Sequence, residues 1–150
     1  MNALVRELAP YVGRICGAIA LSDGDDAMQE TMIAVLKNLP SLREPDALHG
    51  WVRRIAVRES MRLVKARRPD SVSWTLTDAE LTTQLPDLDQ QADVAAVLQS
   101  LPLEHRAVLV LRDLDGLSEA EAAAVLRVPE GTVKSRLHRA RAAFRGRWAS

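Results

Sequence analysis

The sequence predicts an all-α protein made of two small helical bundles joined by an acidic linker. Aromatic residues make up only 3% of the 150 residues, whereas Ala and Leu are abundant, and this favours helices over sheets. Apolar residues recur at spacings of three and four along much of the chain. Hydrophobic residues at 47% and charged residues at 27% are globular proportions. The length is sufficient for one ordinary domain or two small ones.

The first bundle is predicted over residues 1–68. Its first helix covers about residues 2–21, where apolar side chains recur at helical spacing: Leu4, Leu8, Val12, Ile15 and Ile19. The acidic stretch 22–26 supplies caps and suits the positive end of a second helix, which we expect to stop at Pro40.

A third helix is predicted to start after Pro45 and to stop at Pro69, with Trp51 and Ile55 beginning its buried stripe. Residues 69–88 lack sustained periodicity and are interpreted as the linker. The second bundle, residues 89–150, is predicted to contain four further helices: about 89–100, one that Pro102 opens, 118–126 and 130–148.

Positive charge is unevenly distributed, although 20 Lys and Arg balance 20 Asp and Glu. Residues 53–68 carry seven basic side chains against one acid, and residues 134–147 carry six basic side chains and no acid. Residues 69–99 between them carry six acids and no base. Two cationic stripes joined by an acidic connector predict two contacts with one polyanion. Solvated helix faces are the alternative, but such faces ordinarily intersperse Glu among the bases.

The helices predicted over 118–126 and 130–148 form a helix-turn-helix pattern. Ser118 and Glu121 have the spacing of a capping box at the start of the first. One side of the last helix is apolar: Val133, Leu137, Ala140 and Phe144. The other side presents a polar ridge suited to reading bases in a major groove: Lys134, Ser135, His138 and Arg139. A plain surface helix is the alternative. The cap, the turn, the apolar stripe and the ridge together favour a DNA-reading helix over it.

These segments resemble a known family. Residues 101–145, and GTVKSRLHRAR within them above all, resemble region 4 of the extracytoplasmic-function sigma factors of bacterial RNA polymerase. The segment DGDDAMQETMIAVLKNL resembles the region 2 helix that docks on the clamp coiled coil of the polymerase β′ subunit. The segment WVRRIAVRESMRLVKARR resembles the helix that meets the minus-ten element. The resemblance covers nearly the whole chain in the family's order.

The resemblance implies three sets of site residues. Five residues of the last helix would contact the minus-thirty-five element: Thr132, Lys134, Ser135, His138 and Arg139. Three arginines at spacings of four would contact DNA near the minus-ten element: Arg54, Arg58 and Arg62. Three residues of the second helix would contact core polymerase: Asp26, Gln29 and Glu30, although Asp26 is equally explained as a helix cap.

The function implied is that of a sigma factor, which binds core RNA polymerase through the β′ clamp and β flap and directs transcription from promoter DNA. Residues 1–68 would act as region 2 and residues 89–150 as region 4. An anti-sigma factor is the implied regulator. The alternative is a stand-alone helix-turn-helix regulator, in which residues 1–88 would be an interaction domain. The acids of the second helix, followed by an arginine row, favour the sigma factor.

Two departures from the family pattern bear on the site. Arg62 stands where the family often has Asp, so the minus-ten preference does not transfer. Arg127 replaces a frequent Gly in the turn before the last helix, which costs about 1 kcal/mol if this residue is left-handed.

Enzymatic function finds little support, and no metal or cofactor is expected. There is no Gly-rich phosphate loop, the three His are scattered, and the single Cys16 has no His near it in sequence. No apolar run approaches the roughly 18 residues that span a bilayer. The N-terminus lacks a basic segment followed by an apolar core, so we expect no export leader. We therefore expect a cytoplasmic protein without membrane insertion.

Overall fold

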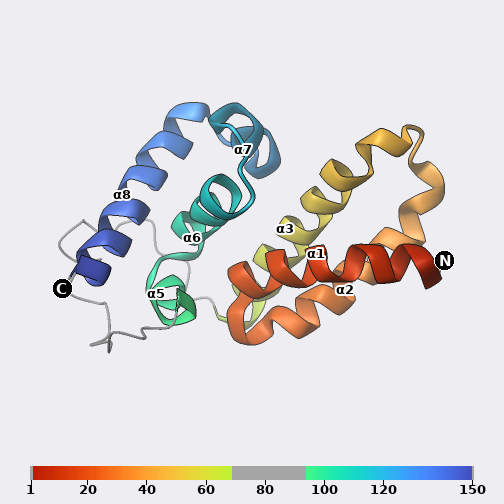
Figure 1. The fold of residues 1–150 in the computed structure, drawn as a ribbon, viewed down its shortest axis with the longest axis horizontal. Helices are drawn as coiled ribbons and strands as arrows, with labels where there is room; N and C mark the ends of the chain where they lie inside the picture. Colours follow the sequence, from red (N-terminus) through yellow and green to blue (C-terminus); the bar gives the residue numbers. More distant parts are fainter. Residues whose placement is uncertain (1, 69–93, 150) are drawn as a thin grey trace. The chain divides into compact units, whose positions relative to one another are not determined.

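The computed structural model describes residues 2–68 and 94–149, and every regular element within these ranges is a helix (Figure 1). This confirms the predicted all-α class for the part of the chain described. The chain divides into two units, residues 1–67 and 68–150. The predicted linker, residues 69–88, and the first residues of the helix predicted over 89–100 lie outside the described residues.

Three α-helices form the first unit: α1 (Asn2–Ala20), α2 (Gly24–Asn38) and α3 (Leu48–Arg67). Short 3-10 turns join them at Leu21–Asp23, Leu39–Ser41 and Pro45–Ala47. Each helix packs against the other two around an apolar core. The largest fully buried side chains of this core are Leu8, Val12, Ile15, Ile19, Val35, Val52, Val57 and Val64. The periodicity of the first helix therefore identified its buried side correctly.

The buried side of α3 differs from the predicted one. Trp51 and Ile55 are only half-buried, so the expectation that they begin the buried stripe is wrong. Val52 and Ala56 are fully buried instead. The physical reason is that α3 turns the side of Val52, Ala56 and Val64 toward α1 and α2, and at about 100° per residue Trp51 and Ile55 point away from that side.

The start of α2 approaches the end of α1 closely. A Cβ atom added to Gly24 would lie 2.9 Å from the Cα of Gly17 and 3.4 Å from the carbonyl oxygen of Cys16. The neighbouring Cys16 is fully buried, and its Sγ lies 3.6 Å from the hydroxyl of Thr31 on α2. Burial raises the pKa of the Cys16 thiol, so Cys16 acts as a small core residue.

The second unit contains α5 (Val94–Ser100), α6 (Leu103–Leu109), the π-helical turn η5 (Val110–Leu114), α7 (Glu119–Leu126) and α8 (Glu130–Ala149). The predicted turn after α6 is present, and Gly116 has the left-handed φ of 74° that glycine adopts readily. Helix α8 packs against both α6 and α7.

The buried Arg106 joins α5 to α6. Its side chain donates hydrogen bonds to the carbonyl oxygens of Leu98 and Leu101, at 3.2 and 3.3 Å. Burial lowers the pKa of Arg106 to about 10, which still leaves it charged at neutral pH. This arginine therefore serves the fold by satisfying carbonyls at the end of α5.

The helix-turn-helix pair has the predicted caps. The Ser118 hydroxyl accepts from the Glu121 N–H at 3.1 Å, and the Ser118 N–H donates to the Glu121 carboxylate at 3.0 Å. This capping box is as predicted. Arg127 then closes α7 in the left-handed conformation, with φ 57° and ψ 46°. An arginine here carries the backbone strain that glycine avoids.

We predict that Gly24→Ala destabilises the first unit by about 2 kcal/mol, because the added methyl group meets the backbone of α1. Gly17→Ala is the matched control, since a Cβ there has nothing within 4 Å. Urea unfolding of both variants measures the difference. Equal stability of the two variants would show that the helices do not approach closely.

We predict that Arg127→Gly stabilises the protein by about 1 kcal/mol by relieving left-handed strain. Arg127→Ala removes the same side chain but keeps the strain, so it brings no such gain. Thermal unfolding of the two variants separates the effects. A glycine variant no more stable than the alanine variant would contradict the account of this turn.

Candidate DNA and polymerase interfaces

Burial of one side of α8 exposes the predicted ridge on its other side. Val133, Leu137 and Ala140 are buried as predicted, and Phe144 is half-buried. We call the predicted minus-thirty-five contacts the recognition ridge: Thr132, Lys134, Ser135, His138 and Arg139. Four of these are exposed and Thr132 is half-buried. The structure therefore brings the five residues together on one surface, while their roles on DNA stay a prediction.

Several basic residues of α8 differ in their surroundings. Those of the recognition ridge face solvent, and Lys134 lies only loosely beside Glu119, with Nζ 3.7 Å from the carboxylate. Two others bind α8 to neighbouring elements. Arg136 lies 3.5 Å from the carboxylate of Glu104 on α6, and Arg141 makes two hydrogen bonds with Asp113 in η5. Sequence reasoning counted all of them as one cationic stripe.

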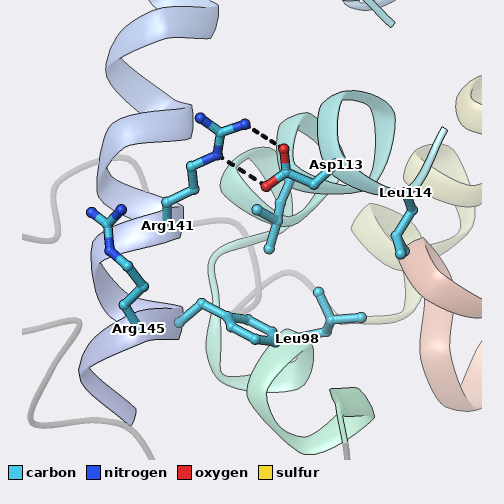
Figure 2. A pocket seen from close by; sticks show the side chains of 7 residues that line it. Leu98, Asp113, Leu114, Arg141 and Arg145 are labelled. Carbon is cyan, nitrogen blue, oxygen red and sulfur yellow. Dashed lines mark hydrogen bonds and ion pairs between the residues drawn. The ribbon is translucent and has the colours of Figure 1, made fainter. Parts of the chain in front are cut away.

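An apolar pocket of about 310 Å³ lies in the second unit and was not predicted. Its apolar lining comes from α5, α6, η5 and α8: Leu98, Leu109, Leu114 and Phe144. Figure 2 shows Arg141 bonded to Asp113 on one side of the pocket, with Arg145 further along α8. Leu114 remains 54% exposed because the π-helical turn places it outside the core. The only sequence signal was a leucine between two aspartates, Asp113 and Asp115.

The arginine row of α3 is exposed as the spacing predicted. Arg54, Arg58 and Arg62 all face solvent. Arg62 is held by carboxylates: Nη2 lies 2.8 Å from Glu59 and 3.9 Å from Glu30 on α2. The hydrogen bonds that Arg62 donates to the Glu59 carboxylate raise the pKa of Arg62. This pairing places a predicted DNA contact directly beside a predicted polymerase contact.

Helix α2 presents its predicted residues at the surface. Asp26, Gln29 and Glu30 are all exposed. Asp26 accepts a 2.6 Å hydrogen bond from Arg67, which also lies 3.3 Å from the buried Asp23. Asp26 therefore ties α2 to the end of α3, and its explanation as a helix cap is wrong because α2 already begins at Gly24.

One apolar residue of α2 was missed by sequence reasoning. Ile33 is 60% exposed and follows Gln29 and Glu30 by four and three positions, so the three lie on one face. An exposed isoleucine flanked by polar side chains has the make-up of a protein contact, in which an apolar centre is surrounded by a polar rim.

Residues 2–68 and 94–149 contain no group of three or more His, Cys, Asp or Glu side chains placed to hold a metal ion. In the same ranges no helix has the length and apolar character needed to cross a bilayer.

Comparison with known families places both units. The family model for sigma-70 region 2 matches residues 4–69, and the model for sigma-70 region 4 matches residues 91–144. The boundary between the two units, after Arg67, lies two residues before the end of the region 2 match.

Several relatives are similar along most of the chain. The ECF RNA polymerase sigma factor SigE of Mycolicibacterium smegmatis is 34% identical over 96% of this chain and 60% of its own length. The RNA polymerase sigma-H factor of Pseudomonas aeruginosa is 32% identical over 89% of this chain and 80% of its own. The ECF sigma-E factor of Haemophilus influenzae is 31% identical over 93% of this chain and 78% of its own length. The chain thus spans about three fifths of SigE but most of the other two.

Two solved structures share the fold. The sigma factor RpoE of Bartonella quintana, in complex with the anti-sigma factor NepR, aligns with a TM-score of 0.70 at 20% identity over 96% of this chain and 93% of its own. CnrH, in complex with the cytosolic domain of CnrY, aligns with a TM-score of 0.61 at 28% identity, over 95% of this chain and 82% of its own. With two matching family models and relatives at least 31% identical of which it covers more than three quarters, the chain belongs to the extracytoplasmic-function RNA polymerase sigma factors.

Proposed function

We propose that this protein binds core RNA polymerase and directs promoter-specific initiation of transcription, without catalysing a reaction itself. The observation that carries the proposal is the pairing, in one chain, of an exposed arginine row beside the polar face of α2 with a helix-turn-helix whose recognition ridge faces solvent. A simple DNA-binding regulator needs only the second of these.

The second unit would read the minus-thirty-five element. In a helix-turn-helix the second helix enters the major groove, where arginine and lysine donate to guanine and a hydroxyl donates or accepts. Arg139 and Ser135 are exposed on α8 for such contacts. Burial of Val133 and Leu137 keeps α8 from turning about its own axis, so the ridge is presented in one orientation.

The first unit would hold polymerase and the minus-ten region. Gln29, Glu30 and the exposed Ile33 offer one face of α2 to the β′ clamp. Arg54 and Arg58 offer positive charge to DNA phosphates, which position a protein on the duplex. Arg62 is paired with Glu59 at 2.8 Å and lies 3.9 Å from Glu30, so it offers less unpaired charge than the other two arginines.

The apolar pocket of the second unit would take the β flap of polymerase. Its leucines and Phe144 line a pocket that an apolar side chain can enter. The exposed Leu114 extends the apolar lining onto the surface. Arg145 at the edge of this lining favours a partner that flanks its apolar residues with acids, whereas Arg141 is already paired with Asp113.

We further propose a cytoplasmic location and regulation by an anti-sigma factor. Polymerase and promoter DNA are in the cytoplasm of bacteria, so this activity requires the protein there. Support for the regulator comes from the similar RpoE, which was solved with the anti-sigma factor NepR.

The polymerase contact is tested by co-migration of the purified protein with core polymerase in gel filtration at low salt. We expect a complex. The double variant Gln29→Ala with Glu30→Ala should weaken it at least tenfold, because both substitutions remove polar side chains from the same exposed face. Glu44→Ala with Asp46→Ala is the matched control on another exposed segment. Absence of a complex with the unaltered protein would refute the sigma-factor proposal and favour the stand-alone regulator.

Base reading is tested by Arg139→Ala in the holoenzyme. We expect a loss of roughly 1–3 kcal/mol in promoter binding and relaxed preference at one base pair of the upstream element. Competition binding against all single base-pair changes measures the preference. A uniform loss, with the salt slope reduced by about 0.9, would instead identify Arg139 as a phosphate contact.

A further inference from the structure

A second pocket of the helix-turn-helix unit is polar and lies beside the recognition ridge. It has a volume of about 250 Å³ between the start of α6 and the first turns of α8. Helix α6 contributes Glu104 and His105, and α8 contributes Gly131, Thr132, Ser135, Arg136 and Arg139. Three of these residues, Thr132, Ser135 and Arg139, belong to the recognition ridge, so the pocket borders the surface proposed to read bases.

The lining chemistry suits an anion. Two guanidinium groups, from Arg136 and Arg139, outnumber the single carboxylate of Glu104. Thr132 and Ser135 add hydroxyl groups that donate hydrogen bonds. This combination of arginine donors and hydroxyl donors is the one that proteins use to bind phosphate oxygens.

The Glu104 carboxylate holds one of the two arginines in place. Glu104 is only 9% exposed, and its Oε2 lies 3.5 Å from Nη1 of Arg136. A buried carboxylate requires a partner, so Arg136 is kept at the pocket wall rather than free in solvent. The guanidinium has five N–H donors in a fixed fork, and pairing with one carboxylate leaves donors for a second acceptor.

From this arrangement we infer that the pocket binds one backbone phosphate of promoter DNA, next to the base pairs that the recognition ridge reads. The inference rests on the proposed function and adds a site to it. Glu104 is a positioning residue and Arg136 a phosphate contact. Such a contact fixes the register of α8 in the groove without carrying sequence information.

The experiment uses holoenzyme and a set of promoter duplexes that each carry a single neutral methylphosphonate linkage in the upstream element. With the unaltered protein, we expect one linkage whose neutralisation weakens binding about tenfold, in line with the strength of a charge-assisted hydrogen bond. Glu104→Gln with Arg136→Gln keeps two paired polar groups but removes both charges. In this variant the same linkage should matter about twofold only, while base preference is unchanged.

Arg127→Gly is the control, because it removes a positive charge from the same unit and lines neither pocket. It should leave the effect of every linkage as in the unaltered protein. Circular dichroism melts confirm that the variants are folded. Ser135→Ala, which removes one hydroxyl donor, provides a second test: neutralising the same linkage should weaken binding of this variant less than binding of the unaltered protein.

The outcomes separate the two levels of the proposal. Suppose that the holoenzyme binds its promoter with intact base preference, but that neutralising each linkage weakens binding of both pocket variants as much as binding of the unaltered protein. The phosphate site is then refuted, and the sigma-factor function stands. If no holoenzyme forms at all, both are refuted.

Discussion

The recognition surface of this protein depends on the burial of one apolar side of α8. Val133, Leu137 and Ala140 are removed from water against α6 and α7, at about 25 cal/mol for each Å² of apolar surface. A rotation by one residue would turn α8 by about 100°, expose this stripe and bury charge. The same burial therefore stabilises the unit and decides which side chains of α8 face solvent.

Several ion pairs hold elements of each unit together. Arg67 with Asp26, Arg136 with Glu104 and Arg141 with Asp113 each join two elements distant in sequence. The exposed arginines of α3 and the recognition ridge remain at the surface. Unit 1 thus aligns α2 with α3, and unit 2 aligns α8 with α6, through ion pairs at the edges of apolar cores.

Local sequence features were sufficient for most of the helices and for the ridge. Periodicity, prolines and the Ser118 capping box depend on nearby residues, so they located α1 to α3, α7 and α8. The family resemblance indicated the strained Arg127. Contacts between distant residues could not be read in this way: the half-buried position of Trp51, the Arg67–Asp26 pair and the pocket beside Leu114 all follow from how helices pack.

The central claim is that the two units act on one promoter together, at a spacing that polymerase sets. Run-off transcription with core polymerase on a library of random promoter fragments tests it most directly. The account predicts that active templates share two short elements at a fixed separation, and that the protein selects none of them without polymerase. Templates sharing a single element, or the same selection by the protein alone, would contradict it.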